Sequence, residues 1–215
     1  MDDQRQLMVR LQLEQRGIRD GAVLRAMSLV PRHLFLPAEV QSQAYTDQAL
    51  PIAEGQTMSQ PFIVALMAQE LNLRGHERVL EVGTGSGYAA AVLSMLAGEV
   101  ISIERSVRLA SAAADVLHEL GYHNVHVICG DGTIGFERFA PFDAISVPAA
   151  APWVPAPLRE QLAEGGRLVI PVGGKKAQML LCLERRNAII SSRKLLGVRF
   201  VPLCGEHAWG DQYHT

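Results

Sequence analysis

Three glycines at alternate positions have the spacing of a loop that holds a charged cofactor against the backbone. Residues 81–88 read Glu-Val-Gly-Thr-Gly-Ser-Gly-Tyr, directly after an apolar run and directly before a helical pattern. Gly83, Gly85 and Gly87 lack the Cβ that would block a tight turn and keep a ligand away from the backbone amides. In a parallel sheet, such a turn lies beside the ligand crevice. The loop therefore predicts cofactor binding at the end of a strand.

Carboxylates at three predicted strand ends indicate which cofactor. Glu104 lies nineteen residues after Gly85, so the loop and this acid also satisfy the dinucleotide pattern. Glu81, two residues before the first glycine, would repel a pyrophosphate but attract a cationic amino group. Asp131, between two glycines, has an acceptor for an adenine amino group. Three acids suit S-adenosylmethionine, which is cationic at sulfur and amine, and we favour it over a dinucleotide.

These residues need a parallel sheet to bring them together. From residue 78 short apolar runs alternate with helical stretches, and strands that are apolar on both faces are typical of a sheet covered by helices on both sides. Right-handed crossovers then give a doubly wound α/β fold. We predict strands over 78–82, 99–104, 125–129, 142–147 and 167–172, helices over 86–98, 106–121 and 155–166, and a strand-rich, antiparallel edge over 177–185 and 188–203.

The rest of the chain is predicted to form one domain with this core. Residues 1–60 contain N-terminal helices followed by a Gly- and Pro-marked irregular loop over 44–61, and Pro61 is well placed as the first residue of a helix. Residues 61–174 form the cofactor-binding core, and residues 175–215 form the C-terminal strands and a substrate segment. Asp143, at the start of its strand, is expected to have a structural role.

Composition excludes several classes of protein. The 215 residues have a formal charge of −2, which excludes the broad basic field of a non-specific nucleic-acid binder. No apolar stretch reaches the roughly 18 residues of a membrane span, and the acidic, Gln-rich N-terminus is not a signal peptide. Three cysteines without a CxxC pattern indicate buried thiols, and the histidines at 118, 123 and 126 have no metal-ligand spacing. We expect a cytoplasmic monomer with no bound metal, nucleic acid or membrane.

Beyond these features, nearly the whole chain resembles the protein-L-isoaspartate (D-aspartate) O-methyltransferases. The most specific segments are VPRHLFLP (30–37) and AYTDQALPIAEGQTMSQP (44–61). VLEVGTGSGYAAAVLS, the GDG turn, FDAISVPAAAPWVP, QLAEGGRLVIPVG and VRFVPL follow in order. The resemblance implies a Rossmann-like methyltransferase fold with a mostly parallel, seven-stranded sheet and S-adenosyl-L-methionine as the cofactor.

The resemblance also implies roles for individual residues. Ser59 is the active-site serine. The expected cofactor contacts are Thr57, Met58, Ser59, Gln60, Glu81, Gly83, Thr84, Gly85, Ser86, Gly87, Glu104, Arg105, Asp131 and Gly132. The expected substrate contacts are Met58, Ser59, Val201, Pro202 and Leu203, the last three through their backbone.

The implied reaction is methylation of the carboxyl group of L-isoaspartyl, and also D-aspartyl, residues in flexible segments of damaged proteins, which starts repair through a succinimide. A side-chain carboxylate has a pKa of about 4, so the nucleophile is already ionised and needs no general base. Catalysis then consists of aligning a carboxylate oxygen with the methyl carbon and the sulfonium sulfur of the cofactor. Ser59 is predicted to orient the anion rather than to attack as a nucleophile; the alternative for Ser59 is a helix cap ahead of Pro61.

Four positions depart from the family pattern. Phe62 replaces a polar-capable ring, Pro148 offers no N–H, and Cys204 and Ala208 lie where relatives often carry polar residues. Two alternatives therefore stay open: a carboxyl methyltransferase specialised for one peptide or small carboxylate, and a cofactor-binding homologue without turnover that serves as an interaction module.

Overall fold

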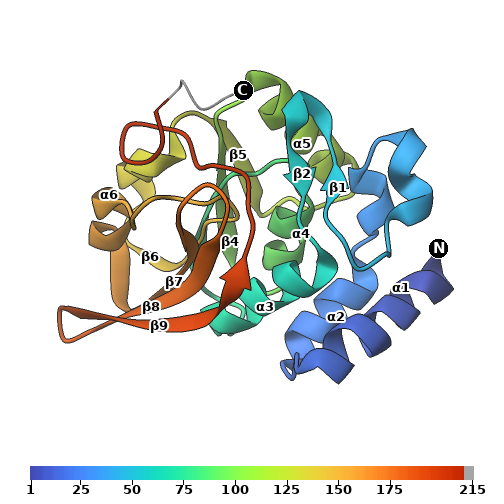
Figure 1. Ribbon diagram of the computed structural model, residues 1–215, viewed down its shortest axis with the longest axis horizontal. Coiled ribbons are helices and arrows are strands. Elements are labelled where there is room, and N and C mark those ends of the chain that lie inside the picture. The colour runs from blue at the N-terminus through green and yellow to red at the C-terminus, as the bar shows by residue number, and fades with distance from the viewer. Residues whose placement is uncertain (211–215) are drawn as a thin grey trace.

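The computed structural model describes residues 1–210, in which seven strands form one sheet in the order β5-β4-β3-β6-β7-β8-β9 (Figure 1). Strands β3 to β7 run parallel to one another, and β8 is antiparallel to both β7 and β9. The strands are β3 (Arg78–Val82), β4 (Glu99–Glu104), β5 (Val125–Cys129), β6 (Phe142–Ser146), β7 (Leu162–Gly173), β8 (Gln178–Arg186) and β9 (Ile189–Val198). The predicted doubly wound, mostly parallel α/β fold with an antiparallel end is confirmed.

Helices cover both faces of this sheet, as apolar residues on both faces of the strands predict. Val79 and Val100 pack into one buried cluster, whereas the next residues along, Leu80 and Ile101, pack into another. Helices α3 (Pro61–Leu71), α4 (Tyr88–Ser94) and α5 (Val107–Glu119) lie on one side, and the short α6 (Ala156–Glu160) lies on the other (Figure 1). Pro61 is the first residue of α3, as predicted.

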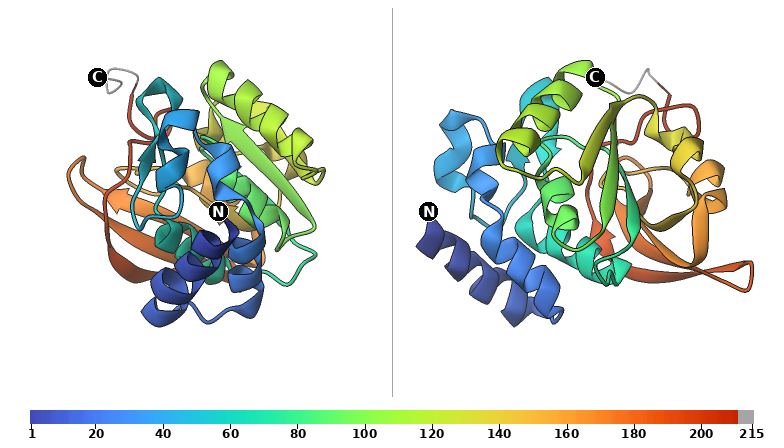
Figure 2. Two further views of the ribbon diagram at one scale, coloured as in Figure 1. Left: turned by 90° about the vertical axis from the view of Figure 1, so that its right-hand side faces the viewer. Right: turned by 180° about the vertical axis from the view of Figure 1, so that it is seen from behind.

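The N-terminal residues are helical and pack beside α3 and α4, far from the turn that joins β8 and β9 (Figure 2). They form α1 (Asp2–Met8), η1 (Val9–Leu13), η2 (Glu14–Arg16), α2 (Gly21–Leu29), η3 (Arg32–Phe35) and η4 (Ala38–Gln43). Asp20 caps α2 by accepting hydrogen bonds from the N–H groups of Ala22 and Val23. Within residues 1–210, no helix is both long and apolar enough to span a bilayer.

Three sequence predictions need correction. The loop over 44–61 is more regular than expected: β1 (Leu50–Pro51) pairs with β2 (Thr57–Met58) around η5 (Ala53–Gly55). The helix predicted to reach 166 ends at Glu160, because the chain from Leu162 onward pairs with β6 as part of β7. The last strand ends at Val198 rather than at 203. Two short helices, η6 (Gly132–Ile134) and η7 (Glu137–Phe139), complete the fold.

The glycine loop depends on one position more than on the others. Gly87 has φ +86°, and a Cβ there would lie 3.2 Å from the Leu117 side chain of α5. A Gly87→Ala substitution is therefore expected to lower the free energy of unfolding by about 1–3 kcal/mol, since left-handed backbone alone costs an L-residue roughly 1–2 kcal/mol. Urea denaturation measures this effect.

Gly21→Ala is the matched control. Gly21 begins α2 with open space around it, so this substitution should leave stability unchanged or raise it by up to about 1 kcal/mol. Equal effects of the two substitutions would contradict the assigned role of Gly87.

Candidate active site

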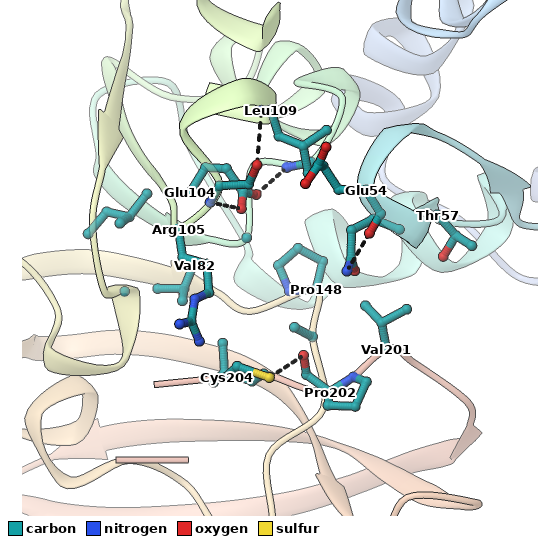
Figure 3. Close-up of a pocket in the computed structure, with 18 residues that line it drawn as sticks. Glu54, Thr57, Val82, Glu104, Arg105, Leu109, Pro148, Val201, Pro202 and Cys204 are labelled. Atoms are coloured by element: carbon teal, nitrogen blue, oxygen red, sulfur yellow. Dashed lines mark hydrogen bonds between the residues drawn. The ribbon is translucent and has the colours of Figure 1, made fainter. Parts of the chain in front are cut away.

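A cavity of about 450 Å³ opens at the carboxyl ends of the central strands, within the usual size of a small-molecule site (Figure 3). We call it the first cavity. The glycine loop, the end of β4, the Gly132 turn and the segment 201–204 enclose it. Its lining residues are Glu54, Gln56, Thr57, Val82, Gly83, Gly85, Ile103, Glu104, Arg105, Ser106, Leu109, Gly132, Pro148, Ala149, Val201, Pro202, Leu203 and Cys204.

Glu104 fixes the glycine loop to the end of β4. One carboxylate oxygen accepts the N–H of Gly85 and the other accepts the N–H of Ser106, each at 2.9 Å. The side chain is buried except for the part that faces the cavity. Each carboxylate oxygen has a second lone pair, so Glu104 can accept hydroxyl donors of a ligand without releasing the loop.

Glu81 lies beneath the first cavity rather than in its lining. It is fully buried, opposite Ser102 in the β3–β4 register, and accepts a 2.5 Å hydrogen bond from the Ser102 hydroxyl. Among residues 1–210 its Oε1 atom has no hydrogen-bond partner. Burial raises the pKa of Glu81 to about 8; the Ser102 hydrogen bond opposes this rise, and the charge of Glu104 adds to it. An unpartnered buried acceptor beside a glycine loop fits a cationic ligand group such as an ammonium.

Asp131 has other partners than a ligand. It accepts the N–H and the hydroxyl of Thr133 and the N–H of Glu206, at 2.7–2.8 Å. Although burial acts in the opposite direction, these hydrogen bonds hold the pKa of Asp131 below its usual range. In this structure Asp131 anchors the chain around Glu206 to the Gly132 turn, and its contact with an adenine stays a prediction.

A second cavity, of about 410 Å³, adjoins the first. Both are lined by Thr57, and Ser59 lines only the second. Gln60 and Phe62, from the same segment, line the second cavity together with residues 196–200 at the end of β9. The predicted active-site segment thus forms the boundary between two cavities.

The charged side chains that line the two cavities differ in sign. The first is lined by the carboxylates of Glu54 and Glu104 and by one guanidinium, that of Arg105. The second is lined by the guanidiniums of Arg16 and Arg199, and no acidic residue among residues 1–210 lines it. The first cavity therefore suits a cation and the second an anion.

Arg32, which the sequence analysis did not single out, holds the Ser59 segment from behind. It is fully buried; Nε donates to the carbonyl of Ala44 at 2.7 Å, and Nη2 donates to the carbonyl of Ser59 at 2.8 Å. Its guanidinium lies 4.7 Å from the ring centre of Tyr88. Within residues 1–210 none of its contacts is a carboxylate, and burial lowers its pKa. The only sign of this role in the sequence is that the VPRH segment contains an arginine.

The structure brings six of the fourteen predicted cofactor contacts into the lining of the first cavity. Those in its lining are Thr57, Gly83, Gly85, Glu104, Arg105 and Gly132, joined by the predicted substrate residues Val201, Pro202 and Leu203. Those outside its lining are Met58, Ser59, Gln60, Glu81, Thr84, Ser86, Gly87 and Asp131. Met58 is buried in β2, Gly87 precedes α4, and the Thr84 hydroxyl pairs with Ser102 at 2.6 Å. Glu54 and Leu109 also line the cavity, and no sequence motif predicts either of them.

The segment 201–203 uses much of its backbone within the protein. The N–H of Ala150 donates to the carbonyl of Val201, and the N–H of Leu203 donates to the carbonyl of Ala150. Pro202 has no N–H. These bonds fix the segment as a wall of the first cavity, so the predicted backbone pairing with a peptide has few groups left to use.

The structure also tests the expected roles of two single residues, Ser59 as a helix cap and Asp143 as a structural residue. Ser59 is not a helix cap, because the N-cap of α3 is Gln60 and no side chain caps this end. Asp143 has the expected structural role, since it accepts the N–H of Arg78 at 2.8 Å at the far end of the sheet. In the described part of the chain, no group of three or more His, Cys, Asp or Glu side chains could hold a metal ion.

Comparison with known proteins agrees with this geometry. The family model described as protein-L-isoaspartate(D-aspartate) O-methyltransferase matches residues 2–208. The chain belongs to this family.

Individual relatives support the assignment. Protein-L-isoaspartate O-methyltransferases of Roseiflexus castenholzii and Marinobacter nauticus are 57% and 56% identical, over 99% and 97% of this chain and 97% and 96% of theirs. A solved protein-L-isoaspartate O-methyltransferase superposes with a TM-score of 0.86 at 31% identity, over 97% of this chain and 67% of that one. A Plasmodium falciparum structure of the same kind, in complex with S-adenosyl-L-homocysteine, gives 0.81 at 28%, over 93% and 97%.

Removing the Arg32 guanidinium tests its role in the family's serine segment. Arg32→Met leaves the buried carbonyls of Ala44 and Ser59 without donors, at a cost of about 1–3 kcal/mol each. We expect the free energy of unfolding to fall by roughly 2–5 kcal/mol in urea denaturation. Arg25→Met, on an exposed face of α2, should stay within about 0.5 kcal/mol of wild type. Similar stability of both variants would contradict the role.

The raised pKa of Glu81 predicts a pH dependence of stability. In the native state the carboxyl stays protonated up to about pH 8, whereas in the unfolded chain it ionises near pH 4.5. The unfolded state therefore gains stability as the pH rises between these values, by up to about 1.4 kcal/mol per pH unit. Stability of wild type relative to Glu81→Gln should fall from pH 5 to pH 8 and level off above. A difference independent of pH would mean that native Glu81 is ionised.

Proposed function

We propose that the chain transfers the methyl group of S-adenosyl-L-methionine to the carboxylate of L-isoaspartyl residues in damaged proteins and peptides. The observation that carries this proposal is the pair of oppositely charged cavities that share Thr57 and meet at the Ser59 segment. A sulfonium cofactor suits the acidic first cavity, and a carboxylate acceptor suits the basic second one. The family assignment supplies the acceptor class.

The residues present fit the cofactor. Gly83 and Gly85 leave room for a ligand to approach the backbone, Glu104 has acceptor sites for ribose hydroxyls, and the unpartnered Oε1 of Glu81 fits an ammonium. Binding of that ammonium would favour the ionised form of Glu81. When bound, S-adenosyl-L-methionine supplies an electrophilic methyl group and leaves as a neutral thioether.

The protein's part in the reaction is alignment. One carboxylate oxygen of the acceptor forms the new C–O bond as the methyl carbon–sulfur bond breaks, and the bonding pair stays on sulfur. No proton is lost, so no general base is required, and within residues 1–210 the half-buried Ser59 hydroxyl has no competing hydrogen bond. Ser59 orients the acceptor anion. The resulting ester carries a methoxy group, which leaves more readily than a carboxylate oxygen. Attack by the next backbone nitrogen on the ester carbonyl then closes a succinimide, and the methoxy group leaves with the nitrogen's proton as methanol.

We also propose that the chain acts as a cytoplasmic monomer on flexible peptide segments. Both cavities are formed by one chain, and within residues 1–210 neither the buried Cys182 nor Cys129, which is exposed rather than buried as predicted, forms a disulfide. Free thiols suit a reducing compartment. A formal charge of −2 gives no attraction to nucleic acid.

A paired-peptide assay tests the proposal. The chain is expected to transfer radiolabelled methyl groups to an isoaspartyl peptide and not to the same sequence with a normal aspartyl residue. Ser59→Ala should lower kcat by about 10- to 100-fold, the value of a hydrogen bond to a charged group. Affinity for S-adenosyl-L-homocysteine should stay within twofold.

Ser191→Ala is the control, because Ser191 is exposed on β9 and lines neither cavity. Equal labelling of the two peptides would exclude isoaspartyl repair and favour a broader carboxyl methyltransferase. Cofactor binding without labelling of any isoaspartyl peptide would exclude catalysis of this reaction.

A further inference from the structure

A guanidinium lies over an aromatic ring at the side of the second cavity. The Cζ atom of Arg16 is 3.9 Å from the ring centre of Phe62, which belongs to the first turn of α3, three residues after Ser59. Nη1 of Arg16 donates to Oδ2 of Asp47 at 2.7 Å. Gln60 in turn donates to Oδ1 of Asp47 at 2.7 Å. The ring and the carboxylate thus hold the guanidinium from two sides.

This arrangement leaves most of the guanidinium's donors for another group. The ion pair with Asp47 uses one nitrogen, whereas a guanidinium has five N–H donors in a plane. The Arg16 side chain is 40% exposed and lines the second cavity with Ser59. A planar donor set that is already held in place loses little entropy when it binds a carboxylate.

Arg199, the other cation of the second cavity, is less constrained. It is exposed, and within residues 1–210 it has neither an ion pair nor an aromatic contact. A long side chain without such contacts must be ordered on binding, which offsets much of the electrostatic gain. Arg16 and Arg199 therefore form a matched pair. Both are cations that line the second cavity, but only the Arg16 side chain is held in place by other residues.

We propose that Arg16 binds the carboxylate of the methyl acceptor, an inference that rests on the proposed function. Phe62 then has a specific role: its ring donates no hydrogen bond to the substrate, but it supports the guanidinium that does. Because methylation converts the carboxylate into a neutral ester, the product loses this attraction. Arg16 thus distinguishes the acceptor from the product, as well as binding the acceptor.

A binding cycle tests the proposal without depending on turnover. Two peptides are compared, one with an isoaspartyl α-carboxylate and one in which that group is a primary amide, by calorimetry with saturating S-adenosyl-L-homocysteine. Wild type should bind the carboxylate at least tenfold more tightly than the amide. Arg16→Met should reduce this ratio to about threefold or less, and Arg199→Met should keep it within twofold of wild type.

Two further measurements separate binding from folding. Arg16→Lys keeps the charge but not the planar donors, so its ratio should fall between those of wild type and Arg16→Met. Affinity for S-adenosyl-L-homocysteine should be the same in all variants. An unchanged carboxylate-to-amide ratio in Arg16→Met would overturn the proposal while methylation by wild type still supported the proposed function. If wild type methylates no isoaspartyl peptide, the function and this inference both fail.

Discussion

A guanidinium buried without a carboxylate partner fixes the relation between the two cavities. Arg32 donates to the carbonyls of Ala44 and Ser59 and lies over the ring of Tyr88, the residue that begins α4 after the glycine loop. One side chain thereby links the segment on the acceptor side to the helix on the cofactor side. Carbonyl dipoles and the ring partly offset the cost of burying this charge. The chemistry needs two ligands in line, and Arg32 holds the protein parts that align them.

The acidic side chains of the first cavity and the arginines of the second lie apart because they come from different parts of the fold. The carboxyl ends of β3 and β4 carry Glu81 and Glu104 to one edge of the sheet, because parallel strands end together. The cations of the second cavity come from elsewhere, Arg16 from the N-terminal helices and Arg199 from the residues after β9. The β1–β2 hairpin lies between these regions. A donor and an acceptor of opposite charge can therefore occupy neighbouring sites of a single chain.

The fold could be predicted from sequence because local signals determine it. Strands apolar on both faces and a glycine loop at the end of β3 give a parallel sheet, its covering helices and the edge at which ligands bind. The site was less predictable where tertiary packing decides it. Nothing local shows that Asp131 turns to Glu206, that Arg32 reaches Ser59, or that Arg16 covers Phe62 from 46 positions away in the chain. Burial and distant partners determine these three roles.

The segment after β9 has a consequence for how this enzyme tolerates changes in its chain. It has little regular structure, yet Asp131 holds the N–H of Glu206, and the Trp209 indole donates to the carbonyl of Ala150. Since residues 201–204 line the first cavity, this tail is part of its wall. A fusion or insertion at the exposed Asn187 turn of the β8–β9 hairpin would leave that wall intact. Trimming the chain ahead of Gly205 would open the first cavity to water.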